Sequence, residues 1–138
     1  MNVLIVGARG AGKTTLIRRV LESLDCPVWG FETEKEGDQV HIYDAGAEHV
    51  PTEENLVGLC GETRGFPVKE GFDRYAPRIL APVKAGSVMI MDELGYLESS
   101  SELFCRAVLE RLGGRDPVIA AVKDRDTAFL SSVRSHPG

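Results

Sequence analysis

The sequence predicts an α/β fold, a three-layer sandwich in which helices cover both faces of a mostly parallel sheet. Two observations predict it. Apolar runs typical of buried strands, at residues 3–6, 88–91 and 117–122, recur between stretches of helical periodicity. A glycine-rich turn, residues 7–12, joins the first run to a helical stretch, as in a strand–turn–helix unit of such a sheet.

Length, charge and cysteine spacing limit the possible classes of protein. A chain of 138 residues is expected to form one domain over residues 1–138. The formal net charge of −5 argues against a basic surface for nucleic acid. The three cysteines are widely spaced, which indicates reduced cytoplasmic thiols rather than a disulfide framework or a zinc site; they are Cys26, Cys60 and Cys105.

The chain opens directly into a strand at Asn2 and contains no apolar run of about 18 residues. We therefore expect neither a signal peptide nor a membrane span, and a cytoplasmic protein. Residues 2–6 read as a central parallel strand covered on both faces. From residue 13 to 24, apolar residues follow helical spacing and predict a helix that ends before Pro27.

The next segment departs from simple strand–helix alternation. Residues 28–33 and 39–43 are rich in β-forming residues, and a short charged turn with Gly37 joins them. This pattern predicts an inserted β-hairpin. Residues 44–71 are interrupted by glycine and proline, so we expect loops with one or two short strands; a long irregular segment of this kind is often functional.

A helix is expected from residue 71 to 85, with Asp73 as its cap, Pro77 in its first turn and an interruption at Pro82. The elements predicted after it are a strand at 87–91, a helix at 101–112 capped by serine, a strand at 117–122 and a short helix at 124–133.

The glycine-rich turn has the pattern G-x-x-x-x-G-K-[ST] between a strand and a helix, which predicts a phosphate-binding loop. Gly7 and Gly12 let the backbone turn its N–H groups inward to form an anion site at the helix N-terminus. Lys13 would reach the β- and γ-phosphates, and the Thr14 hydroxyl would bind Mg²⁺. The expected nucleotide-binding residues are Gly7, Ala8, Arg9, Gly10, Ala11, Gly12, Lys13, Thr14 and Thr15.

A second motif follows the strand at 87–91, where Asp92 and Glu93 come directly after four apolar residues. Carboxylates at the carboxyl end of a parallel strand lie where open α/β sheets bind ligands. Asp92 is therefore expected to hold Mg²⁺ together with Thr14. Glu93 is the candidate base that orders or deprotonates the attacking water, so Lys13 and Glu93 are the expected catalytic residues.

Four elements, in this order, resemble the THEP1-type nucleoside-triphosphatases, a family of P-loop NTPases. They are Gly7–Thr15, Gly30–Thr33, Met91–Glu98 and Pro117–Val122, and the resemblance covers about residues 1–125. It implies Mg²⁺-dependent hydrolysis of ATP, GTP and other nucleoside triphosphates to the diphosphate and phosphate, with little base preference. The chain departs from the family after Thr33, where the usual arginine-containing stretch is missing, and after Glu98, where serines replace a Lys-Ser step.

Several other residues have more than one interpretation. Glu98 resembles the second acid of the family and would anchor the loop after Asp92, approach the site, or complement the dipole of the next helix. Arg64 and Arg74 either bring a guanidinium to the γ-phosphate or are ordinary surface residues. Three further expectations concern aromatic, imidazole and thiol side chains: Trp29 in the core, His41 and His49 without a metal, and Cys60 without a nucleophilic role.

Two alternatives to hydrolysis remain open at the level of sequence. A small nucleoside or metabolite kinase would need an acceptor pocket, for which residues 44–71 offer the only room. A nucleotide-binding adapter would act through a protein partner, whose identity the sequence does not disclose.

Overall fold

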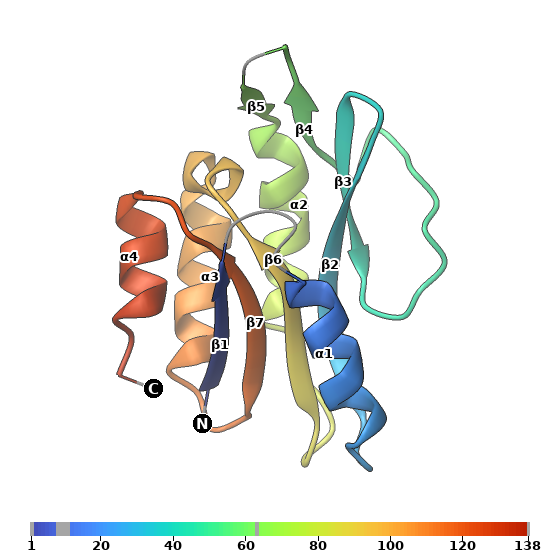
Figure 1. The fold of residues 1–138 in the computed structure, drawn as a ribbon, viewed down its shortest axis with the longest axis vertical. Coiled ribbons are helices and arrows are strands. Elements are labelled where there is room, and N and C mark those ends of the chain that lie inside the picture. The colour runs from blue at the N-terminus through green and yellow to red at the C-terminus, as the bar shows by residue number, and fades with distance from the viewer. Residues whose placement is uncertain (1, 8–11, 63, 138) are drawn as a thin grey trace.

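The computed structural model describes residues 2–7, 12–62 and 64–137, which form one sheet of seven strands with helices on both faces (Figure 1). The elements are β1 (Asn2–Gly7), α1 (Lys13–Glu22), β2 (Val28–Glu36), β3 (Gln39–Asp44), β4 (Leu56–Cys60), β5 (Gly65–Pro67), α2 (Lys69–Ile79), β6 (Val88–Leu94), the 3-10 turn η1 (Leu97–Ser100), α3 (Glu102–Leu112), β7 (Val118–Lys123) and α4 (Ala128–Arg134). Among these residues no helix is long and apolar enough to cross a membrane.

Two apolar clusters of different size hold the layers together. Helix α1 covers one face of the sheet, where Ile17 packs against Ile90 and Ala121 from β6 and β7. Helices α2, α3 and α4 cover the other face and bury the larger cluster (Figure 1). The predicted three-layer α/β sandwich is therefore confirmed.

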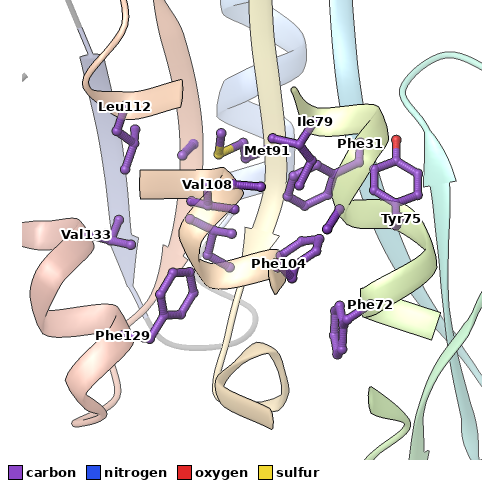
Figure 2. Packing of buried hydrophobic residues seen from close by; sticks show 14 of the residues in the cluster. Phe31, Phe72, Tyr75, Ile79, Met91, Phe104, Val108, Leu112, Phe129 and Val133 are labelled. Carbon is purple, nitrogen blue, oxygen red and sulfur yellow. The ribbon is translucent and has the colours of Figure 1, made fainter. Parts of the chain in front are cut away.

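Aromatic rings connect the sheet to the helices in the larger cluster (Figure 2). The Phe104 ring of α3 lies 5.4 Å from Phe31 of β2 and 4.9 Å from Phe72 of α2, measured between centroids. All three side chains are fully buried. Because each ring of this size buries a large apolar area, this contact fixes β2 relative to α2 and α3.

The strand order is β1-β7-β6-β2-β3-β4-β5, and the first four strands are mutually parallel. Their carboxyl ends therefore lie along the same edge of the sheet. The register places Gly7 beside Lys123 and Glu32 beside Asp92. This edge is where the sequence predicts the phosphate and metal groups.

The prediction of a central position for the first strand is wrong. Strand β1 lies at the edge of the sheet and pairs with β7 alone among the described strands. Its apolar residues are consequently only partly covered, and Val3 and Val6 are each 45 % exposed. An apolar run predicts a buried strand, but the place of the strand in the sheet depends on pairings that the run does not encode.

The predicted hairpin is confirmed and belongs to a larger antiparallel region. Strands β2 and β3 pair across a turn at Gly37, and β3 then pairs with β4 and β4 with β5. The segment 44–71 thus contributes two short strands, as expected. Five strands (β1, β2, β4, β6, β7) run in one direction and β3 and β5 in the other, so the sheet is mixed but mostly parallel.

Helix α2 begins at Lys69 and ends at Ile79, which corrects the predicted span of 71–85 and the predicted cap. Asp73 lies inside the helix, where its carboxylate accepts from Lys69 and from Ser101, the N-cap of α3. Pro77 falls near the helix end rather than in its first turn. The Arg111 guanidinium donates to the carbonyl of Ile79 at 2.7 Å, so a side chain of α3 satisfies the last turn.

Smaller corrections concern other ends. Helix α1 stops at Glu22 rather than 24, where the Ser23 hydroxyl donates to the Val20 carbonyl. Helix α4 starts at Ala128 rather than 124, because Thr127 caps it by accepting from the Leu130 N–H. Strand β6 continues to Leu94, so the two acids after the apolar run are part of the strand.

Gly30 is required where β2 passes β6. Its φ is +129°, and a Cβ built there would lie 2.0 Å from the Ile90 carbonyl oxygen. Gly86 also has a positive φ, +83°, but nothing lies within 4 Å of its Cβ position. Substitutions at the two glycines therefore distinguish the energetic cost of a strained backbone from that of a steric clash.

We predict that Gly30→Ala lowers the free energy of unfolding by about 3 kcal/mol or more, because conformational strain adds to a backbone clash in a buried strand. Gly86→Ala, which carries only the strain, should cost about 1–2 kcal/mol. Urea denaturation of both variants measures the difference. Equal losses would show that β2 and β6 can separate without cost.

Candidate functional site

Lys13 stands at the first position of α1, directly after Gly12, whose φ of +85° turns the chain into the helix. Its side chain is 6 % exposed, and its Nζ donates to the Gly7 carbonyl at 2.7 Å. The ammonium therefore lies at the carboxyl end of β1. The predicted loop residues Ala8, Arg9, Gly10 and Ala11 fall outside the described residues.

Thr14 and Asp92, the two predicted metal ligands, lie in contact. The Thr14 hydroxyl donates to Oδ1 of Asp92 at 3.2 Å. Burial raises the pKa of Asp92, and the nearby carboxylates of Glu93 and Glu32 raise it further, while the Thr14 hydroxyl lowers it. A divalent cation would relieve this crowding of negative charge.

These groups line a cavity of about 350 Å³ at the end of the sheet. Its walls are Gly12, Lys13, Thr14, Thr15, Thr33, Asp92 and Glu93. The cavity thus brings together the predicted loop residues Gly12–Thr15 and both predicted acids. Among the described residues no group of three or more His, Cys, Asp or Glu side chains is arranged to hold a metal. One hydroxyl and one carboxylate nevertheless suit Mg²⁺, which keeps several waters and takes further oxygens from phosphates.

Thr33 was not assigned a role from the sequence, although it ends the Gly30–Thr33 element. Its hydroxyl accepts from the Glu93 N–H at 3.4 Å, across the β2–β6 pair. The contact ties the backbone of the candidate base to the neighbouring strand. The sequence carries no signal for this contact, because nothing in it predicts the pairing of β2 with β6.

Glu93 lies between two lysines. Its Oε2 is 3.3 Å from Lys13 Nζ, and its Oε1 is 3.8 Å from Lys123 Nζ. The carboxylate is about one quarter exposed. The two cations come from α1 and from the end of β7, so three elements meet at this carboxylate.

Glu98 anchors the turn after β6, the first of the three roles considered from the sequence. It lies in η1, is 5 % exposed, and accepts a short hydrogen bond from the Gly95 N–H. Burial raises the pKa of its carboxyl to about 7, although this hydrogen bond and the charge of Lys123 oppose the rise.

A larger cavity of about 600 Å³ adjoins the smaller one. Both are lined by Thr14, Thr33, Asp92 and Glu93, and the larger one extends to the β4–β5 hairpin with Arg64. Residues of the segment 44–71 therefore form part of a cavity beside the candidate base.

His49 lines this larger cavity and contacts two acids of β2. Its Nε2 lies 2.5 Å from Glu32 and its Nδ1 3.3 Å from Glu34. The hydrogen bond with Glu32 raises the pKa of His49. Its ring stacks on Tyr43 at 4.1 Å. The loop before β4 is thereby fastened to β2.

The other sequence candidates divide between the site and the scaffold. Arg64 lines the larger cavity, with its guanidinium 4.9 Å from the Phe66 ring. Arg74 instead donates to the Glu54 carbonyl and lines a separate cavity. Trp29 packs against the core with the Arg111 guanidinium over its ring, as expected. Cys60 is a free thiol on the cavity wall.

A protein-family model described as NTPase matches residues 2–138. The chain belongs to this family. The predicted family, fold and enzyme class agree with this match.

Curated relatives carry the same assignment. The chain is 29 % identical over 161 residues to the nucleoside-triphosphatase THEP1 of Aquifex aeolicus, a match that covers all of this chain and 86 % of the relative. It is 28 % identical over 139 residues to THEP1 of Thermococcus kodakarensis, covering 88 % of this chain and 76 % of that protein.

Two solved structures share the fold. The crystal structure of THEP1 from A. aeolicus superposes with a TM-score of 0.77 at 23 % identity, over all of this chain and 86 % of that one. The solution structure of a human cancer-related nucleoside triphosphatase gives a TM-score of 0.65 at 23 % identity, over 96 % and 82 %. At these identities the likeness establishes the arrangement of the elements.

The raised pKa of Glu98 predicts a pH dependence of stability. Between its ordinary value of 4.5 and about 7, the folded chain holds the proton that the unfolded chain has lost. The favourable contribution of this proton to the free energy of unfolding is therefore complete below about pH 4.5 and is lost as the pH rises to about 7.

Glu98→Gln removes this ionisation and keeps an oxygen for the Gly95 N–H. Relative to this variant, the native chain should lose on the order of 3 kcal/mol of unfolding free energy between about pH 4.5 and 8. Denaturant titrations at several pH values measure the loss, with Glu110→Gln on the exposed face of α3 as the control. Parallel curves for all three proteins would disprove the assignment.

Proposed function

We propose that this chain hydrolyses nucleoside triphosphates, ATP and GTP among them, with Mg²⁺. One observation carries the proposal: Lys13 contacts Glu93 and Thr14 contacts Asp92 within a single cavity at the carboxyl edge of the sheet. Phosphate-binding, metal-binding and water-ordering groups are thus together. The relatives named nucleoside-triphosphatase support the reaction.

Each residue has a distinct part in this proposal. The loop Gly7–Thr15 binds the triphosphate through backbone N–H groups, and the Lys13 ammonium binds the β- and γ-phosphates. Thr14 and Asp92 hold Mg²⁺, which when bound neutralises charge on the phosphate oxygens. Lys13 must exchange part of its contact with Glu93 for the phosphates, since both compete for the same ammonium.

Glu93 acts on the attacking water. Its carboxylate lies 3.3 Å from the ammonium that would hold the γ-phosphate, so a water that it accepts from would face the phosphorus atom. Hydrolysis then breaks the bond between the γ-phosphorus and the bridging oxygen, and the water proton passes to the carboxylate. Because this interaction forms fully only in the transition state, it contributes to rate more than to affinity.

We also propose a single domain acting in the cytoplasm. The free thiols of Cys26, Cys60 and Cys105 support a reducing compartment.

The cavity of about 600 Å³ favours a second candidate, transfer of the γ-phosphoryl group to the hydroxyl of a small polar molecule. Its position beside Glu93 would let a hydroxyl replace the water. Mass spectrometry of reactions containing MgATP with a nucleoside or sugar would distinguish the two reactions. A phosphorylated product would favour transfer, whereas release of inorganic phosphate alone favours hydrolysis.

We predict that Asp92→Asn raises the Mg²⁺ concentration needed for half-maximal hydrolysis by about tenfold or more, because an amide binds this hard cation more weakly than a carboxylate. The measurement is phosphate release as a function of Mg²⁺ concentration. Asp25→Asn, at an exposed position after α1, should behave as the native chain. An unchanged Mg²⁺ dependence for Asp92→Asn would remove Asp92 from the metal site.

We predict that Glu93→Gln lowers kcat by roughly 10²–10⁴-fold, the usual contribution of a general base, while triphosphate affinity changes by less than about tenfold. Single-turnover hydrolysis and equilibrium binding of a non-hydrolysable triphosphate separate the two quantities. The exposed Glu110→Gln is the matched control. A near-native rate would show that Glu93 is not the base, and a joint collapse of rate and affinity would show that it is structural or holds the metal.

A further inference from the structure

Lys123, the last residue of β7, is the second lysine that reaches the carboxylate of Glu93. The two lysines approach different oxygens, Lys123 the Oε1 at 3.8 Å and Lys13 the Oε2 at 3.3 Å. Sequence patterns assign no role to Lys123, because it follows the apolar run at 117–122 as a single charged residue. Parallel pairing of β6 with β7 brings it to the acids.

The turn after β6 shapes the path of the Lys123 side chain. A Cβ at Gly95 would lie 3.3 Å from Lys123 Cδ and 3.8 Å from Cε, so the aliphatic chain crosses directly over this glycine. The ammonium lies 5.7 Å from the centroid of the Tyr96 ring. Side-chain packing and an aromatic face therefore limit the directions open to the charge.

Two hydrogen bonds hold the turn after β6 in place. Buried Glu98 accepts from the Gly95 N–H, and the Tyr96 hydroxyl accepts from the Gly65 N–H at 2.9 Å. The surface over which Lys123 lies is thus connected to both η1 and β5. A support of this kind is what a long side chain requires in order to keep one orientation.

A bound nucleotide would affect the two lysines differently. Lys13 follows the loop glycines and would move toward the phosphates, leaving Oε2 of Glu93 without this contact. Lys123 lies at the end of β7, and its side chain is placed by its contacts with Gly95 and the Tyr96 ring in the turn after β6. One cation would then remain on the carboxylate while the other binds substrate.

We propose that Lys123 is a positioning residue that holds the Glu93 carboxylate toward the attacking water once Lys13 has engaged the triphosphate. The inference rests on the role proposed above for Glu93. It assigns to the end of β7 a function that the phosphate-binding loop and the two acids do not supply. Lys123 itself contacts neither the water nor the phosphates in this role.

The decisive variants are Lys123→Met, which keeps most of the aliphatic chain, and Lys123→Arg, which restores a cation. Lys84→Met, at an exposed position in the loop before β6, is the matched control. Single-turnover hydrolysis of MgATP and the Kd for a non-hydrolysable triphosphate and for a diphosphate are measured for each. Urea denaturation verifies that every variant is folded at the assay temperature.

We expect Lys123→Met to lower the single-turnover rate roughly 10- to 100-fold, with both Kd values within about threefold of native. Lys123→Arg should recover most of the rate, and Lys84→Met should match the native chain. In a Glu93→Gln background, Lys123→Met should lower the rate no further, because the carboxylate that it orients is already absent.

Other outcomes overturn the inference in distinguishable ways. A native rate for Lys123→Met, with Glu93→Gln slow, would disprove the role of Lys123 and leave that of Glu93 intact. A native rate for Glu93→Gln alone would disprove the proposed function of the acid. Weaker binding of the triphosphate but not the diphosphate would make Lys123 a γ-phosphate ligand, and an additive loss in the double variant would also exclude action through Glu93.

Discussion

The ion pair between Lys13 and Glu93 is the contact on which the candidate site depends, because it joins two motifs that are 80 residues apart in the sequence. Neither residue could reach the other without the parallel register of β1, β7 and β6. That register places Gly7 beside Lys123, and Leu94 beside Val122. A shift by one residue would turn each strand's side chains to the opposite face and separate the pair.

The apolar core holds the neighbouring strand β2 against β6 and the helices. The Phe31–Phe104–Phe72 contact fixes β2 against α2 and α3, while Gly30 allows β2 and β6 to approach each other closely. From the same two strands, Thr33 accepts from the Glu93 N–H. The core therefore affects the site by setting the distance between the backbones of β2 and β6. The hydrogen bond from the Glu93 N–H to Thr33 depends on that distance.

The polar contacts of the turn after β6 form a second support for the site. The buried Glu98 carboxylate pays a desolvation cost that is visible in its raised pKa, and in return it accepts from the Gly95 N–H. Gly95 leaves room for Lys123, and Tyr96 lies against its ammonium. The turn thereby links a buried acid to Lys123 and, through it, to the carboxylate of Glu93, although Glu98 does not line the smaller cavity.

The sequence by itself determined the local units. The spacing of Gly7, Gly12 and Lys13 predicts a phosphate loop because it places two glycines and a lysine in a strand–turn–helix unit, and the acids after residue 91 mark a strand end. Strand order and the edge position of β1 were decided by tertiary structure, because they depend on pairing between strands that are distant in the sequence. The span of α2 was decided in the same way, because the Ile79 carbonyl in its last turn accepts from Arg111 of α3. Thr33 and Lys123 could not be assigned for the same reason. Periodicity and motifs act over a few residues, whereas the contacts of these two side chains join strands that only folding brings side by side.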